Sequence, residues 1–204
     1  MNKFWGYSMF LALFTILYNF VEGLLSIYFG SQDATLTLFG FGIDSFIEVI
    51  SGIGILVMVL RIRRNTESPR SGLERTALHI TGTSFYLLAA GLGATAIFDI
   101  STAHKPTTTL PGLVISLISI AIMWGLVLGK RKIGHALNSA PILSDANCSM
   151  VCIYMSVVLL VSSLVFQLTG LGFVDVLGAL GLIYFSISEG KEAFEKAADI
   201  SVDS

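Results

Sequence analysis

The stretch FGFGIDSFIEVIS, residues 39–51, places two carboxylates, Asp44 and Glu48, inside a long apolar run. The surroundings of this pair decide the class of protein. The chain of 204 residues is 54% hydrophobic and 13% charged, whereas about a quarter of the residues in a soluble domain are charged. So few charged side chains cannot cover a globule that faces water, and we therefore predict a membrane protein.

The apolar runs are continuous and long. A membrane-spanning helix needs about 20 mostly apolar residues, whereas barrel strands would be shorter and would alternate apolar with polar residues. We expect an all-α membrane protein of six transmembrane helices in one domain, 1–204. The expected helices cover roughly 4–29, 36–60, 76–98, 111–129, 142–166 and 173–188, and a short tail follows at 189–204. The first run contains Tyr18, Asn19 and Glu22 and lacks a cleavage site of small residues, so we interpret it as a spanning helix and not as a signal peptide.

Basic residues predict the orientation of the helices. If the N-terminus is cytoplasmic, eleven Lys and Arg residues, Lys130 among them, fall in inner segments, and only Lys105 falls in an outer loop. Such an excess is typical of cytoplasmic segments. We therefore expect both termini in the cytoplasm and a multi-pass protein of the cell membrane. Because topology explains the arginines, they do not indicate binding to nucleic acid.

Acidic residues within or near the apolar segments are the main functional signal. There are five: Glu22, Asp44, Glu48, Asp145 and Asp175. A carboxylate on an isolated spanning helix costs about 2.5–3.5 kcal/mol, so it normally faces the bundle interior, where it forms a structural hydrogen bond or marks an ion or proton path. Asp44 and Glu48, four residues apart, share one helix face. Adjacent carboxylates repel in a low dielectric unless a proton or a cation relieves them, so the pair predicts a cation site that exchanges protons.

The fifth expected helix adds further candidate ligands. Asp145, Cys148 and Cys152 are spaced by three and four residues and form one stripe on that helix. Glu22, on the first helix, is expected at a depth similar to that of Asp44. Thiolate beside carboxylate favours zinc or cadmium over magnesium or calcium. The competing interpretation is that the cysteines are ordinary small hydrophobic residues.

Three segments resemble those of the cation diffusion facilitators, a family of six-helix metal carriers that are usually homodimeric proton antiporters. They are LFGFGIDSFIEVISG (38–52), LSDANCSMVCIYMSVVLL (143–160) and GFVDVLGALGLIYFSISEGKEAFEKA (172–197). The first is similar to the family's second helix, whose acidic pair falls on Asp44 and Glu48. The last is similar to its sixth helix, with Asp175 and Glu189 at the acidic positions, and we interpret Asp175 as a packing residue and not a ligand.

The fifth helix departs from the family's pattern of His and Asp four residues apart. If Asp145 is that Asp, Pro141 stands at the His position and cannot bind a metal. Counting back from the sixth helix instead places Cys148 and Cys152 close to the two positions. Both alignments stay open from the sequence, and in either one Glu22 is a candidate to complete the set. The family's usual C-terminal domain does not follow the sixth helix, so dimerisation is expected through membrane helices.

Small residues predict which helices pack closely. The third expected helix contains AAGLGATA (89–96) and the sixth contains GALG (178–181). Helices in lipid approach one another through such residues, and the resemblance implies the same pairing of the third helix with the sixth.

Together, the residues and the resemblance imply a carrier that exports a zinc-like divalent cation from the cytoplasm by proton antiport. The expected ligands are Glu22, Asp44, Glu48, Asp145, Cys148 and Cys152. No cofactor is expected beyond the transported metal, and the expected partners are that metal, protons, the lipid bilayer and a second copy of the chain. Two alternatives remain, a proton-coupled carrier of an organic cation and a membrane adaptor that transports nothing. An enzyme is not expected, because no Ser or Cys nucleophile is placed beside a His base.

Overall fold

The chain folds into six long helices. The structure, a computed structural model, describes residues 2–32, 36–64, 70–102, 110–169 and 173–202. The helices are α1 (Asn2–Gln32), α2 (Leu36–Arg64), α3 (Arg70–Thr102), α4 (Leu110–Leu137), α5 (Ala140–Thr169) and α6 (Phe173–Val202). These described ranges contain no strand, which confirms the predicted all-α class.

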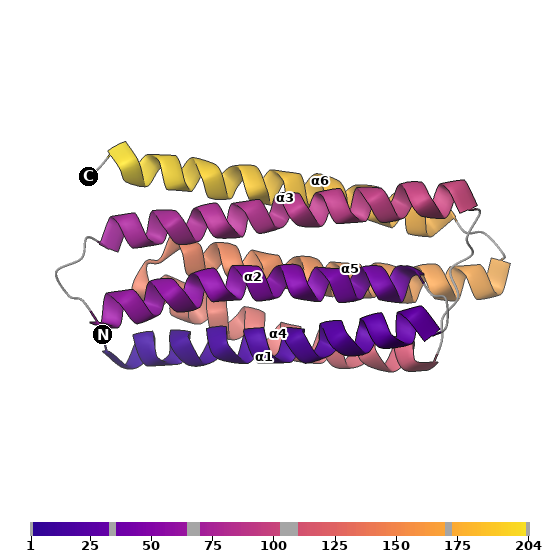
Figure 1. The fold of residues 1–204 in the computed structure, drawn as a ribbon, viewed down its shortest axis with the longest axis horizontal. Helices are drawn as coiled ribbons and strands as arrows, with labels where there is room; N and C mark the ends of the chain where they lie inside the picture. Colours follow the sequence, from indigo (N-terminus) through magenta and orange to yellow (C-terminus); the bar gives the residue numbers. More distant parts are fainter. Residues whose placement is uncertain (1, 33–35, 65–69, 103–109, 170–172, 203–204) are drawn as a thin grey trace.

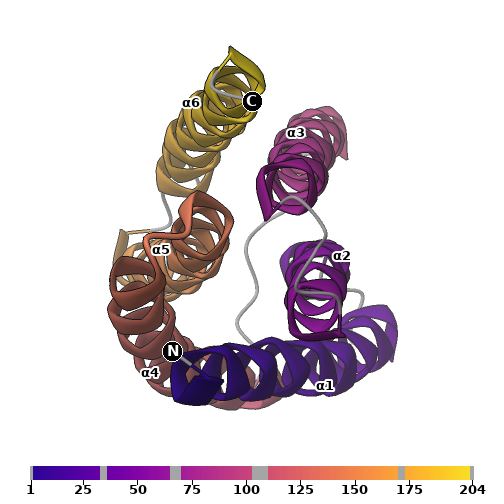
Figure 2. The same cartoon turned by 90° about the vertical axis from the view of Figure 1, so that its left-hand side faces the viewer.

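The helices run side by side along the long axis of the molecule, and both chain ends lie at the same end of the bundle (Figure 1). Viewed along that axis, they follow one another around a ring in the order α1, α2, α3, α6, α5, α4 (Figure 2). The closest pairs are α1 with α2, α3 with α6 and α4 with α5. Helix α5 also contacts α2 and α3 across the ring, and these cross-contacts bring the acids of α2 next to the polar stripe of α5.

Five of the helices are long and apolar enough to cross a membrane. The spans found among the described residues are Lys3–Ser31, Phe41–Arg64, Ser71–Phe98, Leu113–Leu137 and Ala140–Val158. Large apolar side chains such as Phe10, Leu17 and Leu128 are exposed on the outside of the bundle, as expected for side chains that face hydrocarbon. The fold is therefore compatible with a membrane protein.

Two helices extend well beyond their predicted ends. Helix α6 continues through the expected tail to Val202, since Ala193 and Ala197 pack on Leu78 of α3. The i,i+4 ion pair from Lys196 to Glu192, with an N–O distance of 2.6 Å, adds modest support. Helix α4 continues past Lys130 to Leu137.

The turn between α4 and α5 is tight. Asn138 has a φ of 47°, a left-handed conformation that Asn tolerates better than most residues. The N–H of Ser139 donates to the carbonyl of Gly134 over 3.0 Å, which satisfies one of the last carbonyls of α4. The short turn therefore places α5 antiparallel to α4 directly after α4 ends.

Glycines set the spacing of two helix pairs. A Cβ on Gly42 of α2 would lie 3.0 Å from the carbonyl oxygen of Gly23 on α1, so these backbones touch. Between α3 and α6, a Cβ on Gly82 would lie 2.9 Å from the ring of Phe194. The predicted pairing of α3 with α6 is thus confirmed. A Cβ on Gly91, Gly93 or Gly181 would meet nothing within 4 Å, and the side chains of 178–179 in the predicted motif lie outside the described residues.

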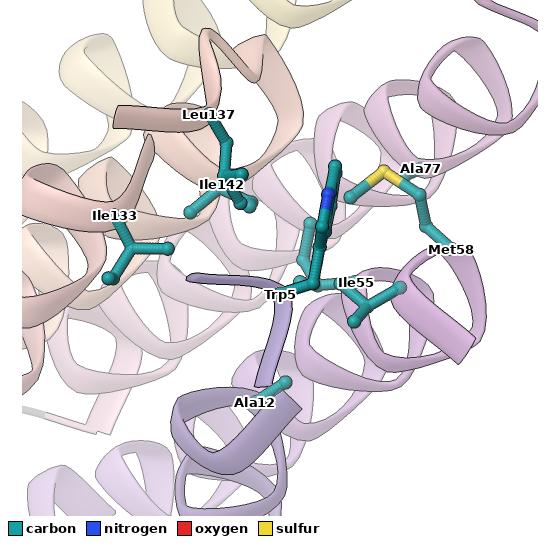
Figure 3. Packing of buried hydrophobic residues seen from close by; sticks show 9 residues of the cluster. Trp5, Ala12, Ile55, Met58, Ala77, Ile133, Leu137 and Ile142 are labelled. Atoms are coloured by element: carbon teal, nitrogen blue, oxygen red, sulfur yellow. The ribbon is translucent and has the colours of Figure 1, made fainter. Parts of the chain in front are cut away.

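An apolar cluster fills the bundle toward the end where the chain termini lie (Figure 3). It draws between one and three side chains from each of five helices: Trp5 and Ala12 from α1, Ile55, Met58 and Val59 from α2, Ala77 from α3, Ile133 and Leu137 from α4, and Ile142 from α5. All nine of these residues are hydrophobic and buried. The polar residues described next lie farther along the helices, so this cluster separates them from that end.

Candidate cation site

All six predicted ligands are buried. Their side chains lie inside the ring of helices: Glu22, Asp44, Glu48, Asp145, Cys148 and Cys152. Serines and threonines of the same helices are buried around them. The helix faces that carry these residues thus turn inward, as the helical spacing predicted.

The register between α2 and α5 fixes where each ligand lies. The thiol of Cys152 donates to Asp44 Oδ2 over 2.8 Å. Two turns away, the hydroxyl of Ser51 donates to Asp145 Oδ1, also over 2.8 Å. Because the two helices are antiparallel, Glu48 lies between these two contacts and level with Cys148. The two acids of α2 therefore stand opposite the two cysteines of α5.

Two carboxylates in this region have unpaired oxygens. Both Oε atoms of Glu48 and the Oδ1 atom of Asp44 are buried and have no hydrogen-bond partner among the described residues. Asn19 and Ser149 are close polar neighbours of Glu48, although neither makes a hydrogen bond of ordinary geometry with it. A buried carboxylate without a partner is costly in hydrocarbon. A bound cation or a proton would satisfy these oxygens.

Glu22 is tied to the same region from α1. Its Oε1 accepts a bond of 2.7 Å from the hydroxyl of Tyr18, one helical turn earlier. Its Oε2 accepts a bond of 3.0 Å from the hydroxyl of Ser45. Ser45 follows Asp44 directly, so Glu22 lies beside the acidic pair, at the depth that the sequence predicted, with both oxygens already engaged.

Asp145 is held in a different way, by Lys130, a residue that the charge distribution assigns to an inner segment. Lys130 Nζ lies 2.9 Å from Asp145 Oδ2 and donates to the hydroxyl of Ser149 over 2.8 Å. Only 2% of the Lys130 surface is exposed. A positional signal was present, because Lys130 continues the buried face of α4 formed by Leu126, Ile133 and Leu137 at helical spacing.

The network around Asp145 reaches a fourth helix. Ser51 bonds Asp145 and also lies 3.2 Å from the hydroxyl of Thr81 on α3. Side chains of α2, α3, α4 and α5 therefore meet at one level. Because Lys130 and Ser51 already occupy its oxygens, Asp145 is the least available of the predicted ligands.

The two cysteines lie in different surroundings. Cys152 contacts Asp44, as described, and packs beside Met123 and Ile153. Cys148 lies in an apolar cluster with Phe41 and Phe85. Both thiols are free of a disulfide. Cys152 is therefore the stronger candidate for a sulfur ligand, although Cys148 is level with Glu48.

These residues do not form a complete ligand set. Within the part of the chain that the structure describes, no three His, Cys, Asp or Glu side chains are arranged to hold a metal ion together. What the helices bring together is an excess of carboxyl groups over basic side chains, since Glu22, Asp44 and Glu48 lie near one another and Lys130 pairs with Asp145. The arrangement can attract a cation, and ligation would require the Cys152 thiol to turn from a donor into a ligand.

Other predicted residues lie outside this region. The side chain of Asp175 is outside the described residues, as is His104. Glu189, the closing acid of the family-like motif, accepts a hydrogen bond of 2.7 Å from Asn147 and so joins α6 to α5. His79 is exposed and packs on Phe194, with 5.2 Å between the ring centroids.

No protein-family model matches the chain, and no curated protein matches it at a significant level.

Proposed function

We propose that this chain is a membrane carrier that exchanges a zinc-like divalent cation for protons at the acidic pair of α2. The ligands would be Asp44, Glu48 and Cys152, with Glu22 close by. The observation that carries the proposal is the pair of buried carboxylates, three of whose oxygens have no hydrogen-bond partner in the described ranges. A protein that only needed helix contacts would have satisfied these oxygens with hydroxyls, as it does for Glu22 and Asp145.

The donor types support the choice of cation. Two carboxylates and a thiol form a mixed oxygen and sulfur set, which suits zinc or cadmium better than the hard cations magnesium and calcium. Zinc takes four ligands, so a fourth would come from Glu22, from Cys148 or from water. Carboxylate and thiol ligands bind a metal in their deprotonated forms, and binding would therefore release protons.

The proposal includes a topology of six spans with cytoplasmic termini. The common end of the two chain termini supports an even number of crossings (Figure 1). The distribution of Lys and Arg supports a cytoplasmic position for that end. Export from the cytoplasm across the cell membrane is the direction that this proposal assigns, with a second copy of the chain bound through membrane helices.

One observation favours a second candidate, a proton-coupled carrier of an organic cation. The described residues do not offer three metal ligands at one point, and an organic ammonium ion needs only carboxylate oxygens, without a coordination geometry. Such a carrier would use Asp44 and Glu48 in the same way but would not need the thiol of Cys152.

Flux in proteoliposomes distinguishes these functions. Purified protein would be reconstituted, and uptake of zinc, cadmium, manganese and magnesium would be followed with and without a pH gradient. We expect zinc and cadmium uptake that is driven by the gradient and lost in Asp44→Asn. Uptake of an organic amine without metal uptake would support the second candidate. The absence of any flux would support a membrane adaptor that transports nothing.

A further inference from the structure

We propose that Lys130 is a tethered competitor of the transported cation, which moves between Asp145 and the carboxylate of Glu48. The inference rests on the proposed function and adds a part to it. The ammonium group of Lys130 pairs with Asp145 in this structure; it would move to Glu48 as the metal leaves and return to Asp145 when another metal ion binds.

The position of Lys130 is the first support. Its ammonium lies between two groups of α5, with Asp145 Oδ2 at 2.9 Å and the Ser149 hydroxyl at 2.8 Å. Ser149 lies one turn along α5 from Asp145, toward Cys152, and is a polar neighbour of Glu48. Lys130 therefore already bonds a residue that stands next to the unpaired carboxylate.

The charges around Glu48 are the second support. Lys130 and Asp145 both lie close enough to Glu48 for their charges to act on its carboxyl group. Within the part of the chain that the structure describes, the two buried oxygens of Glu48 have no hydrogen-bond partner, and Lys carries three donors on a long flexible stem. A change of side-chain rotamer is a small motion compared with a movement of helices, so the ammonium can be shared between two anions.

A cation held by its own chain has a clear chemical consequence. It weakens the binding of any other cation to Glu48, and so it helps a carrier to release its cargo. A merely structural lysine would stabilise Asp145 and leave the affinity for metal unchanged. The two roles thus differ in whether removal of the lysine tightens metal binding or leaves it unchanged.

The test is calorimetric titration of zinc chloride into the purified full-length chain in detergent at one fixed pH. The double variant Lys130→Gln/Asp145→Asn removes the competing ammonium group and keeps the net charge of the pair at zero. We expect it to bind zinc about tenfold more tightly, because one unit charge close to a carboxylate changes cation affinity by about that order. Ser149→Ala removes a bond that holds Lys130 on α5, and we expect it to bind zinc more weakly. The matched control is Ser186→Ala, at a buried serine of α6 that has no hydrogen-bond partner among the described residues, and it should leave the affinity unchanged.

The outcomes separate this inference from the proposed function. Equal zinc affinity in the wild type, the double variant and Ser149→Ala would overturn the competitor role and leave the carrier intact. Weaker binding in the double variant would overturn it too, because Asp145 would then be a ligand. If the double variant does not fold, the affinity of Ser149→Ala decides alone. A wild-type chain that binds no zinc would overturn both the carrier and the competitor.

Discussion

Gly42→Ala should separate α1 from α2 and disturb the acidic region without touching a polar side chain. The new Cβ would lie 2.8 Å from Ile27 Cγ1 and 3.0 Å from the carbonyl oxygen of Gly23. Ordinary contacts between such atoms begin at about 3.5 Å, so α1 must move outward by about half an ångström. One contact is with the backbone, which cannot rotate out of the way.

The size of the effect follows from two contributions. Overpacking of a tight contact costs about 1–3 kcal/mol. The same outward movement would lengthen the bond from Ser45 to Glu22, which is 3.0 Å, to about 3.5 Å, the limit of a useful hydrogen bond, and such a bond in a membrane protein contributes about 0.6 kcal/mol. We expect Gly42→Ala to be less stable by about 2 kcal/mol than a matched Gly to Ala variant elsewhere.

Gly125→Ala supplies that match. Gly125 lies within α4, and a Cβ there would meet nothing within 4 Å, so both variants gain the same helix propensity, about 1 kcal/mol in water. The measurement is unfolding of each variant by sodium dodecyl sulfate in mixed micelles, with thermal denaturation as a second readout. A difference below about 0.5 kcal/mol, which is the scatter of neutral substitutions, would refute the reasoning about the contact of α1 with α2.

Three further predictions concern the proposed site. Asp44→Asn should abolish flux in proteoliposomes and leave the protein folded in detergent, since relief of buried repulsion need not cost stability. The control is Asp199→Asn, at an exposed residue of α6, which should retain flux. Equal activity of the two variants would contradict the role of Asp44. Cys152→Ser should weaken zinc and cadmium transport more than manganese transport, whereas Cys148→Ser should preserve the preference among metals, because only Cys152 contacts a carboxylate; a uniform loss for all three metals would indicate that the thiols only pack. Zinc affinity should fall as the pH decreases, because Asp44 and Glu48 bind metal in their deprotonated form; titration in two buffers of different ionisation enthalpy counts the protons released, and a count of zero would exclude proton exchange.

Helical spacing was enough to predict which faces turn inward. Asp44 and Glu48 share a face because they are four residues apart, and both are buried. The stripe of Asp145, Cys148 and Cys152 is buried for the same reason. These predictions needed only the period of the helix and the cost of exposing a carboxylate to hydrocarbon.

The hydrogen-bond partners of these side chains could not be predicted from helical spacing, because they depend on the register of one helix against its neighbour. Spacing alone does not say that Cys152, and not Cys148, meets Asp44, and this register also turns Asp145 toward Lys130. Lys130 was assigned to an inner segment because positive charge is a topological signal. That signal records the side of the membrane and does not distinguish a solvated lysine from one that turns into the bundle.

The bonds between helix pairs have a consequence for the states that the protein can populate. Helix α2 is joined to α5 by two side-chain bonds, those of Cys152 with Asp44 and of Ser51 with Asp145, whereas α1 and α2 touch through the backbones of Gly23 and Gly42. Side-chain bonds in a membrane interior contribute about 0.6 kcal/mol each, so these two bonds add little more than about 1 kcal/mol to the apolar packing of Ile142 and Val151 of α5 near α2. The contact of α2 with α5 is also less extensive than the contact of α2 with α1. If the bundle opens, we therefore expect it to open between α2 and α5, while α1 and α2 move together as one unit.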